Sequence, residues 1–170
     1  WTAPRAADRV DAVGNPSADV FGVDPRAWRT SRIALDSQNN AWVINVAADA
    51  NRYHHVPLVG SVVRVMADIS NLIPTVTSQN HGDILPFGTD QAIQVFPVGE
   101  AGEIPRVVVH DHNHYVWVGF YQGAYFQKYQ YDPESLSLIA VGSKVTSAYD
   151  FSPYDARIDD SGRIWFSSRD

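Results

Sequence analysis

The sequence predicts an all-β fold made of repeated units of four antiparallel strands. Three segments align without gaps, and in each an aspartate is followed six positions later by a tryptophan. The segments are residues 34–46, "ALDSQNNAWVINV", residues 109–121, "VHDHNHYVWVGFY", and residues 157–169, "RIDDSGRIWFSSR". Between turns rich in glycine and proline the apolar residues alternate with period two, and no long segment has the 3.6-residue period of a helix.

The repeated aspartates and tryptophans are expected to have structural roles. The pairs are Asp36 with Trp42, Asp111 with Trp117, and Asp159 with Trp165. An aspartate that starts a turn accepts hydrogen bonds from the backbone N–H groups just ahead of it, and Asn, Ser and Gly tolerate the turn dihedrals. We expect each tryptophan to fill a layer between neighbouring sheets, because one indole ring buries a large apolar area.

Two further β patterns follow each of the first two tryptophan strands. Residues 60–68 and 123–132 begin with Gly and end with Asp, and residues 92–99 and 136–142 end in Val-Gly. The predicted units are therefore residues 31–99, residues 105–142 and an incomplete unit at residues 153–170. Residues 1–18 are expected to be irregular. The first unit carries two insertions, before and after its third strand.

Composition and charge exclude several classes of function. The chain has 170 residues, enough for one domain, and a net charge of −6 without a basic run, which argues against binding to nucleic acid or anionic membranes. It has no cysteine, so a disulfide scaffold, a thiolate metal site and a cysteine nucleophile are excluded. No apolar segment approaches the roughly 18 to 20 residues of a membrane span.

A repeated four-stranded unit of roughly 40 to 50 residues is typical of a β-propeller blade. The core pattern D-x-x-G-x-[IV]-W-[FV], clearest in "DDSGRIWFSS", resembles the blades of streptogramin-lyase-like propellers, with NHL-type propellers as close relatives. The similarity spans roughly residues 31–170. The turn glycine is present only as Gly162, with Asn39 and His114 in its place elsewhere. The resemblance implies a β-propeller fold and an extracellular or cell-envelope location.

Two full blades and a partial third cannot close a ring, since propellers usually have about four to eight blades. We therefore expect a single, partial β-propeller domain that is a piece of a larger propeller, with ends that are not natural domain boundaries. The missing blades would come from the rest of the protein, from another copy or from another chain. Without them, apolar sheet faces and strand edges would be exposed.

One face of the propeller is the predicted ligand site. In propellers the loop between the second and third strands lies on the same face as the loops that join successive blades. This places eight candidate residues on one rim: Arg52, Tyr53, His54, His55, Glu103, Tyr121, Tyr149 and Asp150. An aromatic and charged rim suits a sugar, a peptide or another small ligand, and the alternative is an exposed rim without a ligand.

The segment "HDHNH" places His110, His112 and His114 at alternate positions, which on a flat strand would give a workable metal site. The repeat alignment argues otherwise, because His110 aligns with the apolar residues Leu35 and Ile158, while the other two histidines align with turn residues. We expect one packed histidine, two exposed ones, and no metal or other cofactor.

No nucleophile elbow, phosphate loop, zinc-protease motif or paired-carboxylate signature is present, so no catalytic residue is predicted. The favoured function is a non-catalytic propeller segment for ligand or protein binding, or for assembly. The alternative is a metal-dependent propeller lyase or hydrolase. The resemblance implies that such an enzyme uses a metal with a histidine and a carboxylate, and no such pair maps onto this chain residue by residue.

Overall fold

The computed structural model describes residues 30–46, 59–70, 91–146 and 150–169. These residues form strands and turns, and none of them is helical. Within them, no helix long and apolar enough to cross a membrane is found. The strands are β1 (Thr30–Leu35), β2 (Ala41–Asn45), β3 (Gly60–Val65), β4 (Ile93–Val98), β5 (Pro105–His110), β6 (Tyr115–Phe120), β7 (Tyr125–Asp132), β8 (Ser137–Val145), β9 (Pro153–Ile158) and β10 (Ile164–Ser168).

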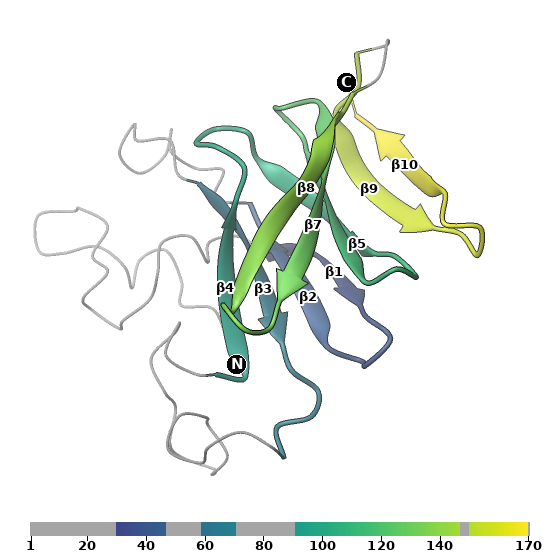
Figure 1. Cartoon of the computed structure of the whole chain (residues 1–170). Coiled ribbons are helices and arrows are strands. Elements are labelled where there is room, and N and C mark those ends of the chain that lie inside the picture. The colour runs from purple at the N-terminus through teal and green to yellow at the C-terminus, as the bar shows by residue number, and fades with distance from the viewer. Residues whose placement is uncertain (1–29, 47–58, 71–90, 147–149, 170) are drawn as a thin grey trace, which may run out of the picture.

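The strands form two four-stranded sheets and a hairpin. The first sheet has the order β1-β2-β3-β4, the second β5-β6-β7-β8, and β9 pairs with β10 (Figure 1). Every pair is antiparallel, and within each sheet and the hairpin the strands pair in sequence order. The predicted all-β fold of four-stranded antiparallel units is therefore confirmed. The insertions expected in the first unit lie outside the described residues.

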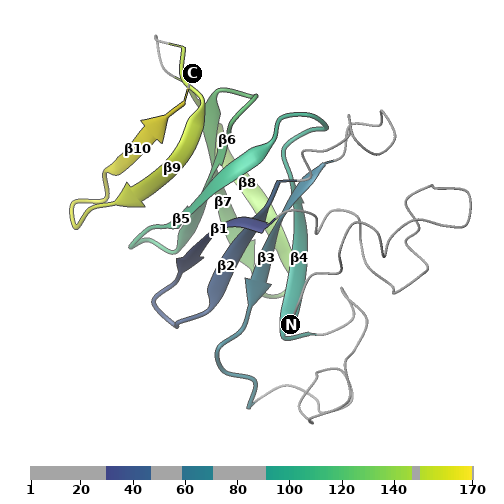
Figure 2. The same ribbon diagram turned by 180° about the vertical axis from the view of Figure 1, so that it is seen from behind.

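The sheets are arranged as successive blades of a β-propeller. The second sheet lies between the first sheet and the hairpin, which forms one edge of the molecule in both views (Figures 1 and 2). The first strands contact one another in order, β1 with β5 and β5 with β9. Inner strands that follow one another around a common axis are the arrangement of a propeller. The described residues thus comprise two four-stranded blades and the first two strands of a third.

The β8 strand is longer than the sequence pattern indicates. The pattern ends the fourth strand at Gly142, whereas β8 continues to Val145. The register between β7 and β8 shifts here, from Lys128 opposite Val141 to Phe126 opposite Val145. Gly142 has φ of 72°, a left-handed conformation that glycine adopts without steric cost, so the strand passes through a bulge and continues.

The main core lies between the first and second sheets. It contains Trp42, Ile44, Val62, Phe96, Val98, Val108, Val116, Val118, Phe120, Tyr125 and Tyr129. A smaller cluster between the second sheet and the hairpin contains Val107, Val109, Phe126 and Ala156. Successive side chains of strand β6 point to opposite faces of the sheet and so contribute to both clusters. Val116 and Val118 belong to the main core, and Trp117, between them, packs against the smaller cluster. Both faces of the second sheet are therefore buried.

The prolines six residues before two of the repeated aspartates pack against glycines of the preceding sheet. Pro105 and Pro153 are fully buried and begin β5 and β9. A Cβ atom at Gly60 would overlap the Pro105 ring, and one at Gly119 would lie 2.9 Å from Cβ of Pro153. The glycines thus allow each inner strand to approach the previous blade closely.

The three aspartate turns have the same hydrogen bonds. In each, one carboxylate oxygen accepts from the backbone N–H groups two and four residues ahead. The other oxygen accepts from the indole Nε1–H, at 3.0 Å from Trp42, 2.8 Å from Trp117 and 2.9 Å from Trp165. Each aspartate therefore fixes both a turn and the orientation of a tryptophan ring in the strand that follows.

The missing turn glycine does not change the turn. The residue three positions after the aspartate has φ of 63° at Asn39, 64° at His114 and 77° at Gly162. Asn and His are among the non-glycine residues that adopt the left-handed region most readily. Asn39 and His114 therefore adopt the same left-handed backbone conformation as Gly162.

The three tryptophans differ in burial. Trp42 is 2% exposed in the main core, and Trp117 is partly buried against the smaller cluster. Trp165 is 63% exposed. The expectation that every tryptophan fills a layer between sheets is thus wrong for Trp165, because no described strand lies on that side of the hairpin.

Candidate functional site

Each inner strand contains a bulge at the same repeat position. Thr30 pairs with Asn45 and Arg32 with Ile44, so the register passes over Ser31. It passes over Arg106 in β5 and Tyr154 in β9 in the same way. All three residues stand five positions before the repeated aspartate. A β-bulge re-aims the side chain of the extra residue, which is why bulges are frequent beside binding sites.

A cavity of about 370 Å³ lies at the bulges of β1 and β5, and we call it the bulge cavity. Its lining is Thr30, Ser31, Arg32, Val46, Ile104, Arg106 and Tyr121. Loops from two connections meet here, since the backbone N–H of Tyr121 donates to the carbonyl of Ile104 at 2.8 Å. The volume falls at the lower end of the range for small-ligand pockets.

Tyr154 lies among three guanidinium groups. The Cζ atom of Arg106 is 4.0 Å from the centre of the Tyr154 ring, that of Arg32 5.3 Å and that of Arg169 5.6 Å. The Tyr121 ring meets the same tyrosine edge-on at 6.4 Å. Interaction first with Arg106 and then with Arg169 lowers the pKa of the Tyr154 hydroxyl. Aromatic rings and cations from three blades therefore gather around Tyr154, in contact with three residues that line the bulge cavity, Arg32, Arg106 and Tyr121.

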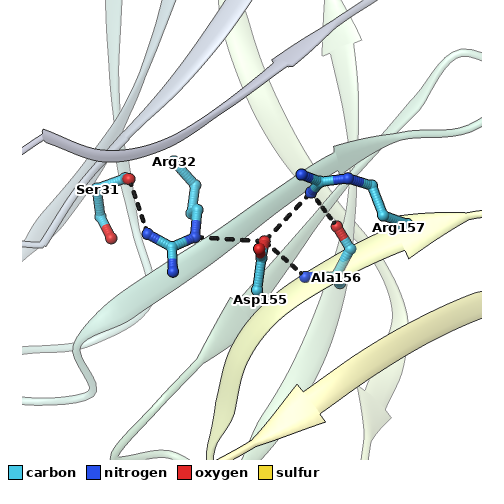
Figure 3. Close-up of polar contacts among 5 residues, drawn as sticks. All are labelled: Ser31, Arg32, Asp155, Ala156 and Arg157. Carbon is cyan, nitrogen blue, oxygen red and sulfur yellow. Dashed lines mark hydrogen bonds and ion pairs between the residues drawn. The ribbon is translucent and has the colours of Figure 1, made fainter.

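One carboxylate balances part of this charge. Arg32 Nε lies 3.3 Å and Arg157 Nη1 3.2 Å from Oδ1 of Asp155, which also accepts from the Ala156 N–H (Figure 3). The first ion pair joins β1 of the first blade to β9 of the third. Among the described residues, neither Arg106 nor Arg169 forms an ion pair with a carboxylate.

One buried donor at the cavity, the Nε of Arg106, has no acceptor among the described residues. Within the described part of the chain, the buried Nε atoms of Arg32 and Arg106 make no hydrogen bond, although Arg32 is in ion-pair range of Asp155. An unsatisfied buried donor costs free energy that an incoming acceptor would recover. The site is therefore positively charged, in a chain of net charge −6, and has a spare donor.

Only three of the eight predicted rim residues belong to the described residues. Tyr121 lines the bulge cavity, and Asp150 is exposed. The carboxylate of Glu103 is occupied by the Tyr125 hydroxyl at 2.6 Å, the Glu100 N–H at 2.7 Å and Lys144 Nζ at 3.1 Å. The other five rim residues lie outside the described residues: Arg52, Tyr53, His54, His55 and Tyr149.

The partners of Glu103 also shift its pKa. Burial alone would raise this pKa, but the hydrogen bonds, led by that from Tyr125, lower it overall. Because its acceptor oxygens are used by three partners of its own chain, Glu103 is poorly suited to hold a ligand or a proton.

Six residues at the cavity and around Tyr154 were not predicted from the sequence. They are Ser31, Arg32, Arg106, Tyr154, Asp155 and Arg169. A signal was present, since five of them occupy, or follow directly after, the position five residues before the repeated aspartate. Arg106 is also the one charged residue between Pro105 and His110, in an otherwise apolar strand.

The histidine segment does not form a cluster of ligands. His110 stacks on Trp42 with ring centres 6.2 Å apart, while His112 and His114 are exposed. Across the ranges that the structure describes, no group of three or more His, Cys, Asp or Glu could hold a metal ion.

A second cavity, of about 670 Å³, lies between the first two sheets beside the Asp36 turn. Two of its charged residues, Asp36 and Arg64, have partners within the chain, although the buried Nε of Arg64 makes no hydrogen bond among the described residues. Asp36 accepts from Trp42, and Arg64 donates to Gln94 at 3.3 Å and lies over the Tyr131 ring at 4.6 Å. Among the described residues, three guanidinium groups meet at Tyr154 beside the bulge cavity, whereas Arg64 is the one arginine that lines the second cavity. The bulge cavity is therefore the stronger candidate for binding an anion.

Burial of His110 predicts a loss of stability in mild acid. Desolvation lowers its pKa below 6.5, against the opposing effect of Asp36 and Asp111. The folded state therefore favours the neutral ring. Its contribution is complete above the unfolded value of 6.5 and is lost as pH falls through the lower folded value.

The free energy of unfolding in urea, measured from pH 7.5 to 5, should fall for the wild-type chain. His110→Leu, which inserts the residue that Leu35 provides in the first blade, should fall less steeply. Equal slopes for the two proteins would contradict a role for His110.

Three comparisons with known proteins complete the description. No family model matches the sequence, and no curated protein matches it. The structure is similar to that of a catalytically inactive virginiamycin B lyase from Staphylococcus aureus, determined with quinupristin, at a TM-score of 0.41 and 10% sequence identity. The similarity covers 86% of this chain and 51% of the lyase, so this chain spans about half the length of that structure.

Proposed function

We propose that this chain is a non-catalytic β-propeller segment that binds a small organic anion in the bulge cavity. The observation that carries the proposal is the convergence of Arg32, Arg106 and Arg169 on Tyr154, where Asp155 is the one carboxylate that pairs with these arginines among the described residues. A guanidinium group presents a planar set of donors that matches carboxylate and phosphate oxygens. A carboxylate or phosphate group is thus the chemistry that this site would recognise.

An anion fits the lining better than a neutral sugar does. A sugar would leave the charges of Arg106 and Arg169 without a carboxylate partner among the described residues, whereas an anion would supply both a counter-charge and an acceptor for the buried Nε of Arg106. Val46 and Ile104 offer apolar contact for the remainder of a small ligand. The preferred ligand therefore has an anionic end and a small apolar body.

Binding, rather than catalysis, is supported by the side chains at hand. The residues that line the cavity include no histidine, glutamate or cysteine. The nearby carboxylate of Asp155 is engaged by two arginines of the same chain. Within these described residues the cavity is equipped to hold a charge rather than to transfer a proton.

The test is a calorimetric titration of the 170-residue chain with malonate, with inorganic phosphate and with glucose. We expect saturable binding of at least one anion that weakens as salt is added, and no binding of glucose. Arg106→Gln should weaken anion binding about tenfold or more, or roughly 1.4 kcal/mol. The matched control is Arg163→Gln, which removes an equal charge paired with Asp159 at the distant hairpin turn.

Circular dichroism would verify that both variants are folded. Equal anion affinity in both variants would contradict the proposal, as would failure of the wild-type chain to bind either anion. Glucose binding that survives Arg106→Gln would instead favour a sugar site elsewhere.

A further inference from the structure

The interface between the first and second blades is centred on Trp42, Val108 and His110. The Trp42 ring faces the second sheet, where it stacks on His110 with ring centres 6.2 Å apart. Val108, two residues earlier on β5, is 3% exposed and belongs to the same cluster. The interface therefore pairs the repeat tryptophan of one blade with two inner-strand positions of the next, one and three residues before the repeated aspartate.

The same three repeat positions are exposed at the two edges of the described blades. Trp165, the equivalent of Trp42, is 63% exposed. Leu35 and Ile33, the equivalents of His110 and Val108, are each 61% exposed. Ala34, between them, packs on the main core, so Ile33 and Leu35 point away from the second sheet.

The pairing register supports this equivalence. Ile33 lies opposite Val43 and Leu35 opposite Ala41, as Val108 lies opposite Val118 and His110 opposite Val116. On the other edge, Trp165 lies opposite Arg157, on the face of the hairpin away from the second sheet, whereas Phe166 packs against Phe126 at 5.4 Å. One edge therefore exposes the equivalent of Trp42, and the other edge exposes the equivalents of Val108 and His110. Together these are the two sides of the contact that is buried between the first and second blades.

We propose that copies of this chain associate head to tail, with Trp165 of one copy packed on Ile33 and Leu35 of the next. The two surfaces differ from each other, so the contact is heterologous and repeats in one direction, which gives a closed ring or an open filament rather than a two-fold dimer. Burial of three large apolar side chains, in a contact whose geometry the chain already uses between its first two blades, favours this association.

The test uses two variants that each remove one half of the contact. Trp165→Ser keeps the Ile33 and Leu35 surface, and Leu35→Ser keeps the tryptophan surface. Light scattering should give a mass above the 18.8 kDa of one chain for the wild type, rising with concentration. Each variant alone should stay monomeric, whereas an equimolar mixture should form a one-to-one dimer and nothing larger.

The matched control is Leu136→Ser, which removes an apolar side chain that is 53% exposed in the turn between β7 and β8. It should associate as the wild type does. A wild-type chain that stays monomeric at all concentrations would overturn the proposal. So would association abolished by Trp165→Ser but unchanged by Leu35→Ser, which would indicate a contact between two hairpins.

Discussion

Replacing Trp42 with alanine should lower the free energy of unfolding by about 3 to 5 kcal/mol, because Trp42 is 2% exposed and lies between two sheets. The same change at Trp165 should cost no more than about 0.5 kcal/mol in the monomer, because that ring is 63% exposed. Both values come from urea unfolding followed by far-ultraviolet circular dichroism, at a protein concentration where light scattering shows monomers.

Trp117→Ala provides the internal comparison, since this ring makes the same hydrogen bond to its aspartate but is only partly buried. Its effect should lie between those of the other two replacements. Equal losses at all three positions would show that the turn hydrogen bond, which is common to them, outweighs packing between the sheets.

Replacing Asp36 with alanine should lower the free energy of unfolding by about 2 to 4 kcal/mol, since several hydrogen bonds to a charged acceptor are lost together. Its carboxylate accepts from the backbone N–H groups of Gln38 and Asn40, from the Asn40 side chain and from Trp42, at 2.9 to 3.0 Å. Without it, the indole N–H of a buried ring has no acceptor. Asp36→Asn, which keeps one oxygen for the backbone donors, should lose less in the same urea assay.

The same carboxylate should make stability depend on pH in acid. Burial acts to raise the pKa of Asp36, but hydrogen bonds, first those from the Asn40 and Trp42 side chains, lower it below 3.8. The contribution is therefore complete above the unfolded value of 3.8 and is lost as pH falls through the lower folded value. Between pH 5 and 2.5 the wild-type chain should lose more stability than Asp36→Asn, and parallel curves would contradict this account.

The fold could be predicted because its main signals are local. An aspartate and a tryptophan six residues apart are joined by one hydrogen bond and one turn, so the repeat is visible in the sequence without knowledge of the tertiary structure. Alternation of apolar residues identified the strands for the same reason. Burial of the tryptophans was harder to predict, because it depends on what lies beside each blade.

The candidate site could not be predicted in the same way. Arg32, Arg106 and Tyr154 are far apart in the sequence and meet only because the inner strands of three blades come together. Their orientation depends on bulges, which are defined by pairing between strands rather than by any one segment. Glu103 was a reasonable candidate as a charged loop residue, but its partners Tyr125 and Lys144 are 22 and 41 residues away.

The residues at the bulges contribute side chains near the cavity but take no part in the pairing between strands. The register passes over positions 31, 106 and 154, so side chains there can be exchanged without changing any pair of cross-strand neighbours. Serine, arginine and tyrosine occupy these positions here. Ser31 and Arg106 line the bulge cavity and Tyr154 lies against Arg106, so substitutions at these positions would change the charge and shape of the proposed anion site while the paired strands stay in place.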